Sequence, residues 1–459
     1  MRRQVAAALT LVVVLFGLLT GPAAVAEPTE PVLPPTETVT SPGTEDCSQR
    51  EQPPPPVDTS ENVPPGQAPP APLPVPDPPI GGDALAGCGL VLPASARPLP
   101  PDITAAGWVV ADLDTGEVLG GRDPHGRYRP ASTLKLLTML VMLENLTDLD
   151  QVVVGTETDA SQEGSSVGIG PGGRYTVEQL LLFLMMGSGN DVANALARAN
   201  GGEDATVADM NAAAAELNAL DTRAATVSGL DGPGQMTSAY DLALIARADM
   251  ALDPFPELIG TQYSQVPGWG PNESFGIAND NKLLFNYPGA IGGKTGFTDD
   301  SGNTYVGLAE RNGRRLVVTM LAGSQQPRRQ WMQAASLLDW GFSLTTAAEP
   351  VGTLVPPGPA GRPGATPSST PVAPTPTGSS AGTTVPTAPS GSVTDPVTAT
   401  ARTSTGAVVP AAAGTGRSSG LPGWGLAVLI VGITVLGGLA AWGVAVARRP
   451  DDPHVRHSA

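Results

Sequence analysis

Apolar residues alternate with turn residues at both ends of the central part of the chain, which is typical of strands. Residues 108–113 predict a strand, residues 114–116 its turn, and residues 118–119 the start of a return strand. Residues 303–308 and 315–321 predict a hairpin around Asn312-Gly313, a dipeptide favoured in type I′ turns. Because helices are expected between these two groups of strands, the pattern predicts one sheet, built from distant segments and packed against helices.

The region between the strands has the longer apolar repeats of helices. Residues 134–143 are strongly apolar, residues 238–250 are amphipathic, and residues 330–342 predict a closing helix. Residues 176–186 predict a further helix that begins with a capping box formed by Thr176 and Gln179. We interpret it as a core helix that presents Ser188 at its end. The expected fold class is therefore α/β, of the α+β type.

Two segments are too polar and too rich in proline to form a core. Residues 27–98 are dominated by Pro, Thr, Glu and Ser and are expected to be extended and mostly disordered. Residues 347–420 are rich in Pro, Thr, Ser, Ala and Gly and predict a stalk. Residues 99–346 remain as the single catalytic domain.

The two ends of the chain predict export and membrane anchoring. Residues 1–26 resemble a signal peptide, with Ala24-Val25-Ala26 at the cleavage site; an uncleaved anchor is the alternative. Residues 421–447 predict a transmembrane helix, because a helix of about 24 apolar residues spans roughly 36 Å. Arg448-Arg449 would then begin a cytoplasmic tail, residues 448–459. We therefore expect a single-pass protein of the cell membrane whose catalytic domain lies outside, on the cell-wall side.

Charge and cysteine content exclude several functions. The net charge of −18 argues against a nucleic-acid partner, which needs clustered Lys and Arg. Cys47 and Cys88 are the two cysteines, for which a disulfide is the default in an exported protein and two free thiols are the alternative. With His125 they cannot build a usual structural zinc site, and we expect neither metal nor cofactor. His125 itself is expected in a surface turn, Asp-Pro-His-Gly.

Three short motifs carry the candidate chemistry. In chain order they are the S-x-x-K of Ser132 to Lys135, the S-x-N of Ser188 to Asn190, and the K-T-G of Lys294 to Gly296. Each motif alone is weak. However, of the 25 basic side chains only Lys135, Lys282 and Lys294 are lysines, and two of these stand in the motifs. We expect Lys282 to be a surface or structural residue.

The spacing of the first motif suits nucleophilic catalysis. If Ser132 opens a helix, Lys135 lies one turn later on the same face. A neutral amine there could accept the hydroxyl proton, and burial together with a second cation, Lys294, would lower the pKa of Lys135. An arginine could not serve, because it does not lose its proton.

In combination, the motifs resemble those of the D-alanyl-D-alanine carboxypeptidases among the low-molecular-mass penicillin-binding proteins. Further similar segments are residues 163–176, 228–231, 237–246, 281–289 and 294–302, so that the resemblance covers residues 99–345. It implies a β-lactamase/DD-peptidase-like transpeptidase fold, an antiparallel sheet packed with helices. It also implies removal of the terminal D-alanine from peptidoglycan stem pentapeptides, with β-lactams as covalent inhibitors.

The resemblance implies roles for the catalytic residues. Ser132 would be the nucleophile and Lys135 its general base. Ser188 would return a proton to the leaving D-alanine, and Asn190 would hold the amide of the substrate.

The same resemblance places the substrate carboxylate at the third motif. The implied substrate-binding residues are Lys294, Thr295, Gly296, Phe297 and Arg329. Lys294 would keep the site positive, Thr295 would contact the terminal carboxylate, and the backbone N–H groups of Ser132 and Phe297 would form the oxyanion hole. Many relatives have His where this chain has Phe297, which leaves only a backbone role there. Arg328 is the alternative to Arg329, and an arginine that is merely solvated is a third reading.

Three other functions use similar residues. A class A β-lactamase needs a deacylating glutamate in an E-x-x-x-N pattern between the second and third motifs, and no glutamate there has Asn four residues later. A penicillin adduct on Ser132 is therefore expected to persist. A non-catalytic receptor for muropeptides or β-lactams would not need Lys135 as a base. A DD-endopeptidase acting on cross-links shares the chemistry and stays open.

Overall fold

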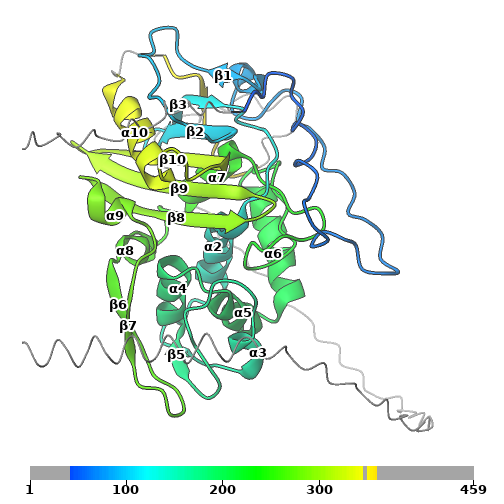
Figure 1. The fold of residues 1–459 in the computed structure, drawn as a ribbon, viewed down its shortest axis with the longest axis vertical. Helices are drawn as coiled ribbons and strands as arrows, with labels where there is room; N and C mark the ends of the chain where they lie inside the picture. Colours follow the sequence, from blue (N-terminus) through cyan, green and yellow to red (C-terminus); the bar gives the residue numbers. More distant parts are fainter. Residues whose placement is uncertain (1–41, 345–348, 359–459) are drawn as a thin grey trace, which may run out of the picture. The chain divides into compact units, whose positions relative to one another are not determined.

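The computed structural model describes residues 42–344 and 349–358, and all structural statements below refer to them. Figure 1 shows a sheet with helices on both sides. A long N-terminal segment, drawn in blue, runs along the right-hand side of this view. The strands are β1 (Leu90–Val91), β2 (Gly107–Asp112), β3 (Glu117–Arg122), β4 (Val152–Val154), β5 (Arg174–Thr176), β6 (Tyr263–Val266), β7 (Phe275–Ala278), β8 (Ala290–Thr298), β9 (Gly302–Arg311), β10 (Arg314–Gly323) and β11 (Gly352–Thr353).

The helices include two short 3-10 turns. They are η1 (Asp83–Ala86), η2 (Ala131–Leu134), α2 (Lys135–Asn145), α3 (Glu157–Ala160), α4 (Val177–Met186), α5 (Asn190–Ala199), α6 (Glu203–Glu216), α7 (Ala239–Asp249), α8 (Phe255–Gly260), α9 (Leu283–Asn286) and α10 (Gln330–Ser343).

The main sheet is antiparallel and joins both ends of the central region. Its strand order is β1-β3-β2-β10-β9-β8, and β11 pairs with β3. β2 pairs with β10 over Gly107–Asp112, which confirms that distant segments share one sheet. β8 lies at the end of this order, so one side of its backbone has no strand partner among the described residues.

Two apolar layers explain why the central strands are buried on both faces. Val109 and Val317 pack into a core with α2, α4 and α7, whereas Val110 and Val318 pack on the other face with Leu337 of α10. Successive side chains of a strand point to opposite faces, so a strand covered on both sides is apolar throughout. Each predicted helix is present within a few residues of its expected bounds.

Local signals predicted the helix starts and the hairpin correctly. Thr176 and Gln179 form the expected capping box at the start of α4. Asn312 and Gly313 both have positive φ in the turn between β9 and β10, as a type I′ turn requires. The described part of the expected stalk differs from the prediction, because β11 adds to the sheet.

The N-terminal segment also differs from the prediction. Residues 42–93, which we call the strap, are extended, but they make specific contacts with the domain instead of being disordered. Cys47 and Cys88 form a disulfide, and Arg127 donates hydrogen bonds to the carbonyl oxygens of Leu73 and Pro74 at 2.8 and 2.7 Å. Proline has little backbone freedom to lose, so few contacts are enough to order such a segment.

The predicted signal peptide (1–26), transmembrane helix (421–447), cytoplasmic tail (448–459) and most of the stalk lie outside the described residues. Within residues 42–344 and 349–358, no helix is both long enough and apolar enough to cross a membrane.

Candidate active site

Ser132 lies on the 3-10 turn η2 rather than on the α-helix that the spacing suggested. The turn begins at Ala131, whose φ of 46° is unusual for a residue other than glycine, and it leads directly into α2 at Lys135. In a 3-10 helix, side chains three residues apart lie directly above one another. The Nζ atom of Lys135 accordingly lies 2.9 Å from the Oγ atom of Ser132.

Lys135 is completely buried, and its surroundings favour a neutral amine. Its Nζ atom lies 2.7 Å from Oδ1 of Asn190 and 2.5 Å from the carbonyl oxygen of Ser228. A neutral amine has two N–H groups and one lone pair. The two carbonyl acceptors take both N–H groups, which leaves the lone pair to accept the hydroxyl proton of Ser132.

The electrostatics agree with this geometry. Burial, and secondarily the charge of Lys294, hold the pKa of Lys135 well below its usual range, against an opposing effect of Asp191. Lys135 can therefore serve as a general base near neutral pH.

The second motif connects α4 to α5 and faces the first. Ser188 has a φ of 57° and is buried, and Nζ of Lys294 donates a hydrogen bond to its Oγ at 2.9 Å. Asn190 opens α5, and its Nδ2 donates to the carbonyl oxygen of Glu163 at 2.6 Å. Asn190 is thus fixed between Glu163 and Lys135, which orients its amide.

The third motif lies on the edge strand β8, close to the nucleophile. A Cβ atom on Gly296 would lie 2.9 Å from the backbone nitrogen of Ser132 and 2.3 Å from Oγ1 of Thr304. Only glycine lets β8 approach η2 so closely. This contact brings together the two backbone segments that the resemblance assigns to the oxyanion hole.

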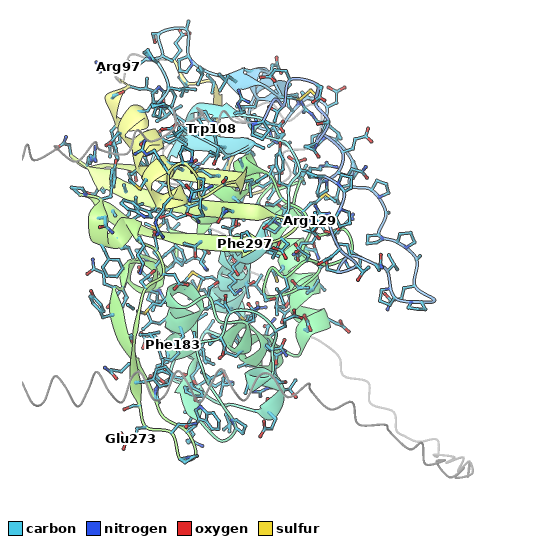
Figure 2. The ribbon with its side chains drawn as sticks, in the orientation of Figure 1. Arg97, Trp108, Arg129, Phe183, Glu273 and Phe297 are labelled. Carbon is cyan, nitrogen blue, oxygen red and sulfur yellow. A yellow bond between two sulfur atoms is a disulfide. The ribbon has the colours of Figure 1, made fainter. Side chains whose placement is uncertain are left out.

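Lys294 is also buried, which lowers its pKa to about 8, with Asp280 acting in the opposite direction. Besides Ser188, its Nζ donates to the carbonyl oxygen of Thr295. Phe297 follows on the same strand and is 60% exposed (Figure 2). The site therefore combines the buried amine of Lys294 with the exposed, apolar side chain of Phe297 on the same strand.

Arg329 is exposed and immediately precedes α10. Arg328 is half-buried, and its carbonyl oxygen accepts a hydrogen bond from Gln333. The choice between these arginines for the substrate carboxylate stays a prediction. Lys282 is exposed and lies over the ring of Phe285, in agreement with a surface role.

The motif analysis missed Asp191, which orders the loop of residues 163–169 beside Asn190. Its buried carboxylate accepts hydrogen bonds from the backbone N–H groups of Val167, Gly168 and Ile169 and from the Ser166 hydroxyl. This carboxylate orders the loop whose Glu163 and Ser165 carbonyl oxygens bond Asn190. Its position directly after Asn190 was the available signal.

The expectation for His125 was wrong. Its ring is buried, with Nδ1 2.8 Å from Asp221 and Nε2 3.0 Å from the carbonyl oxygen of Ile80 in the strap. The Asp-Pro-His-Gly turn would be on the surface, but the strap covers it. Burial alone would lower the pKa of His125, but the hydrogen bonds to Asp221 and Ile80 together with the charges of Asp221 and Asp241 raise it.

Two groups of described residues have the donor atoms of a metal site. They are His125, Asp221 and Asp241, and Glu61, Asp231 and Asp300, with donor atoms within 4.8 Å of one another in each group. In each group an arginine already pairs with a carboxylate, Arg127 with Asp221 and Arg129 with Glu61.

Comparisons with known proteins agree with this site. The peptidase S11 model, described as D-alanyl-D-alanine carboxypeptidase, matches residues 94–325. The D-alanyl-D-alanine carboxypeptidase DacB2 of Mycobacterium tuberculosis is 48% identical over 268 residues, which cover 58% of this chain and 90% of that protein.

Solved structures are similar as well. A crystal structure of a D-alanyl-D-alanine carboxypeptidase from Mycobacterium tuberculosis H37Rv is 47% identical, with a TM-score of 0.55, over 57% of this chain and 99% of that one. The Streptomyces K15 DD-transpeptidase is 28% identical, with a TM-score of 0.51, over 54% of this chain and all of that one. With its three motifs assembled around Ser132, the chain belongs to the D-alanyl-D-alanine carboxypeptidase family, peptidase S11.

Proposed function

We propose that the chain is a serine D-alanyl-D-alanine carboxypeptidase that removes the terminal D-alanine from peptidoglycan stem pentapeptides. The observation that carries the proposal is the buried Lys135 amine, 2.9 Å from the Ser132 hydroxyl and hydrogen-bonded to two fixed carbonyl groups. This geometry is that of a nucleophile with its general base.

The residues divide the reaction between them. Oγ of Ser132 attacks the carbonyl carbon between the two D-alanines while its proton moves to Nζ of Lys135. The C–N bond then breaks, and the leaving amine takes a proton relayed through the Ser188 hydroxyl, which Lys294 orients. Water hydrolyses the ester, releases the shortened peptide and restores the Ser132 hydroxyl.

The neighbours of Lys135 support a long-lived penicillin adduct. Its hydrogen-bond partners among the described residues are a hydroxyl, an amide and a backbone carbonyl, and none is a carboxylate. A β-lactamase of class A uses a glutamate to activate the deacylating water. We therefore expect stoichiometric inhibition by penicillin instead of rapid turnover.

The direct test is release of free D-alanine from a diacyl-D-alanyl-D-alanine peptide. The wild-type chain should release it, and Ser132→Ala should not. Mass spectrometry after benzylpenicillin should show one adduct, on the Ser132 peptide. If penicillin binds covalently but no D-alanine appears, the chain is a receptor; cleavage of cross-linked dimers in preference to pentapeptides would instead indicate a DD-endopeptidase.

We further propose that the chain is anchored in the cell membrane by residues 421–447, with its catalytic domain on the cell-wall side. The support is the uncharged, apolar stretch at residues 423–447 followed by Arg448-Arg449. A chain ending at Gly420 should appear in the medium, whereas the full chain should fractionate with membranes. Recovery of both forms in the soluble fraction would contradict the anchor.

A further inference from the structure

The strap precedes the residues that match the family model, and it contacts the segment leading to the nucleophile. Three side chains at alternate positions before Ser132 form hydrogen bonds with the strap: those of His125, Arg127 and Arg129. His125 contacts the Ile80 carbonyl oxygen, Arg127 those of Leu73 and Pro74, and Arg129 that of Pro54 at 2.7 Å. All three side chains therefore face the strap, and two of them are arginines.

Arg129 also pairs with an acidic side chain of the strap. Its guanidinium donates two hydrogen bonds to the Glu61 carboxylate, and its side chain is almost fully buried. Such bidentate pairs fix orientation as well as distance. Because Arg129 is three residues before Ser132, this pair ties the strap to the backbone that enters η2.

The same stretch of the strap also contacts the turn that follows β8. Asp300, in the turn after β8, accepts hydrogen bonds from the backbone N–H of Val57 and the hydroxyl of Ser60. That turn is closed by Thr298 and Ser301, which bond each other's backbone N–H groups at 2.9 and 3.0 Å. Asp300 is three residues after Phe297, so its hydrogen bond with Val57 connects the strap to the end of β8 that carries the K-T-G motif.

We propose that strap residues 54–61 form a positioning clamp for the oxyanion hole, with Glu61 and Asp300 as its positioning residues. The clamp joins the segment that leads to Ser132 to the segment that contains Phe297. The backbone N–H groups of these two residues are the expected oxyanion donors. Among the described residues β8 has no strand on its outer side, and the strap adds a constraint at the turn that follows β8. The inference rests on the proposed acyl-enzyme chemistry.

Oxyanion stabilisation depends on small displacements. Loss of one donor costs about 10²-fold or more in rate, and a shift of about 1 Å can have a comparable effect. Release of the clamp leaves both donors in place but less well aligned. We therefore expect a loss of about tenfold in the acylation step.

The test measures acylation of the full chain by a fluorescent penicillin over a range of concentrations. This separates the rate constant of the covalent step from the dissociation constant of the preceding complex, and mass spectrometry gives the fraction of chains that react. Asp300→Ala and Glu61→Ala should lower the rate constant about tenfold, with binding and the reactive fraction unchanged. A strap that only stabilises the fold would lower the reactive fraction and leave the rate constant of the reacting chains unaltered.

Two further variants complete the test. Asp300→Asn keeps an oxygen to accept the Val57 N–H and should recover most of the rate. Asp114→Asn removes the negative charge from an exposed aspartate–arginine pair, with Arg315, at the turn between β2 and β3, and should react within about twofold of wild type.

The outcomes separate the two proposals. A wild-type chain that forms no adduct contradicts the proposed function. A wild-type chain that reacts, with Asp300→Ala and Glu61→Ala reacting as fast as Asp114→Asn, contradicts the clamp alone. Should Glu61→Ala fold poorly, Glu61→Gln keeps the size of the side chain but loses its charge and one of the two oxygens that accept from Arg129. A rate constant of its reactive fraction equal to that of Asp114→Asn would contradict the clamp.

Discussion

At the scale of single residues, the site depends on two buried lysines with different surroundings. Burial, and secondarily the charge of Lys294, hold the pKa of Lys135 well below its usual range, whereas burial lowers the pKa of Lys294 to about 8. The first can accept a proton while the second still attracts a carboxylate. Lys135 lies beside Ser132 and can act as its base, whereas Lys294 lies beside Ser188 and can attract the carboxylate.

Lys135→Arg should abolish acylation although it keeps the positive charge. Arginine does not deprotonate in proteins, so no lone pair is available for the Ser132 proton. Loss of a general base costs about 10²- to 10⁴-fold. The adduct formed with benzylpenicillin, followed by mass spectrometry over time, measures the loss. Acylation at more than a tenth of the wild-type rate would exclude Lys135 as the base.

The pH dependence should be bell-shaped. Activity rises with pH as Lys135 loses its proton, because only the neutral amine is a base. It falls again as pH passes about 8, because Lys294 then becomes neutral and no longer attracts the substrate carboxylate. The measurement is kcat/KM for D-alanine release between pH 5 and 10. Lys294→Arg should move the falling limb to higher pH; an unmoved limb would assign it to another group.

At the scale of elements, the geometry of the site depends on how closely β8 approaches η2, which carries Ser132. The glycine of K-T-G lets an edge strand lie against the nucleophile, and Asp191 anchors the loop that fixes Asn190. Rigid elements thus hold the catalytic side chains, while the loop behind them is ordered by one buried carboxylate.

Gly296→Ala should impair acylation more than it impairs folding. The added methyl would lie 2.3 Å from Thr304 Oγ1 and 2.9 Å from the Ser132 nitrogen, so β8 must move away from the nucleophile. We expect a loss of about 10²-fold in the acylation rate constant. Gly276→Ala in β7 is the matched control, because its nearest neighbour would be an ordinary contact at 3.4 Å. Equal rates in the two variants would show that the approach of β8 is not critical.

How far the sequence predicts the molecule depends on the range of the interactions. The capping box of Thr176, the Asn312-Gly313 turn and the Ser132–Lys135 pair are set by residues within four positions of one another, and all were predictable. Burial of His125 and the role of Asp191 depend on partners far away in sequence. Proline content alone indicated disorder for the strap, since composition does not reveal its carbonyl contacts with Arg127 and Arg129.

At the scale of the whole molecule, the strap lies outside the residues that the family model matches and adds contacts to the domain. The Cys47–Cys88 disulfide closes a loop of the strap that includes both the clamp residues and the contacts of Arg127. A crosslink over a loop of this length stabilises the closed form by about 2–4 kcal/mol.

Replacing both cysteines should loosen the strap without unfolding the domain. In Cys47→Ser/Cys88→Ser we expect limited proteolysis to cut within residues 42–93 first, while residues 99–344 stay protected by their own core. Peptide mass spectrometry of the digest identifies the cuts. A Ser161→Ala variant, exposed and far from the disulfide in sequence, controls for the substitutions. Cuts distributed equally over both regions would show that strap and domain unfold together.

The contact between Val57 and Asp300 also has a consequence for the order of folding. It joins residues 243 positions apart, whereas Ser132 and Lys135 are neighbours on one turn. Contacts that close such long loops cost the most chain entropy and tend to form late. We expect a newly made chain to pair its serine with its lysine early and to become fully reactive only when the segments around Val57 and Asp300 have met. Reactivity toward penicillin would then report completed folding, since an immature chain would have the catalytic pair and lack the alignment.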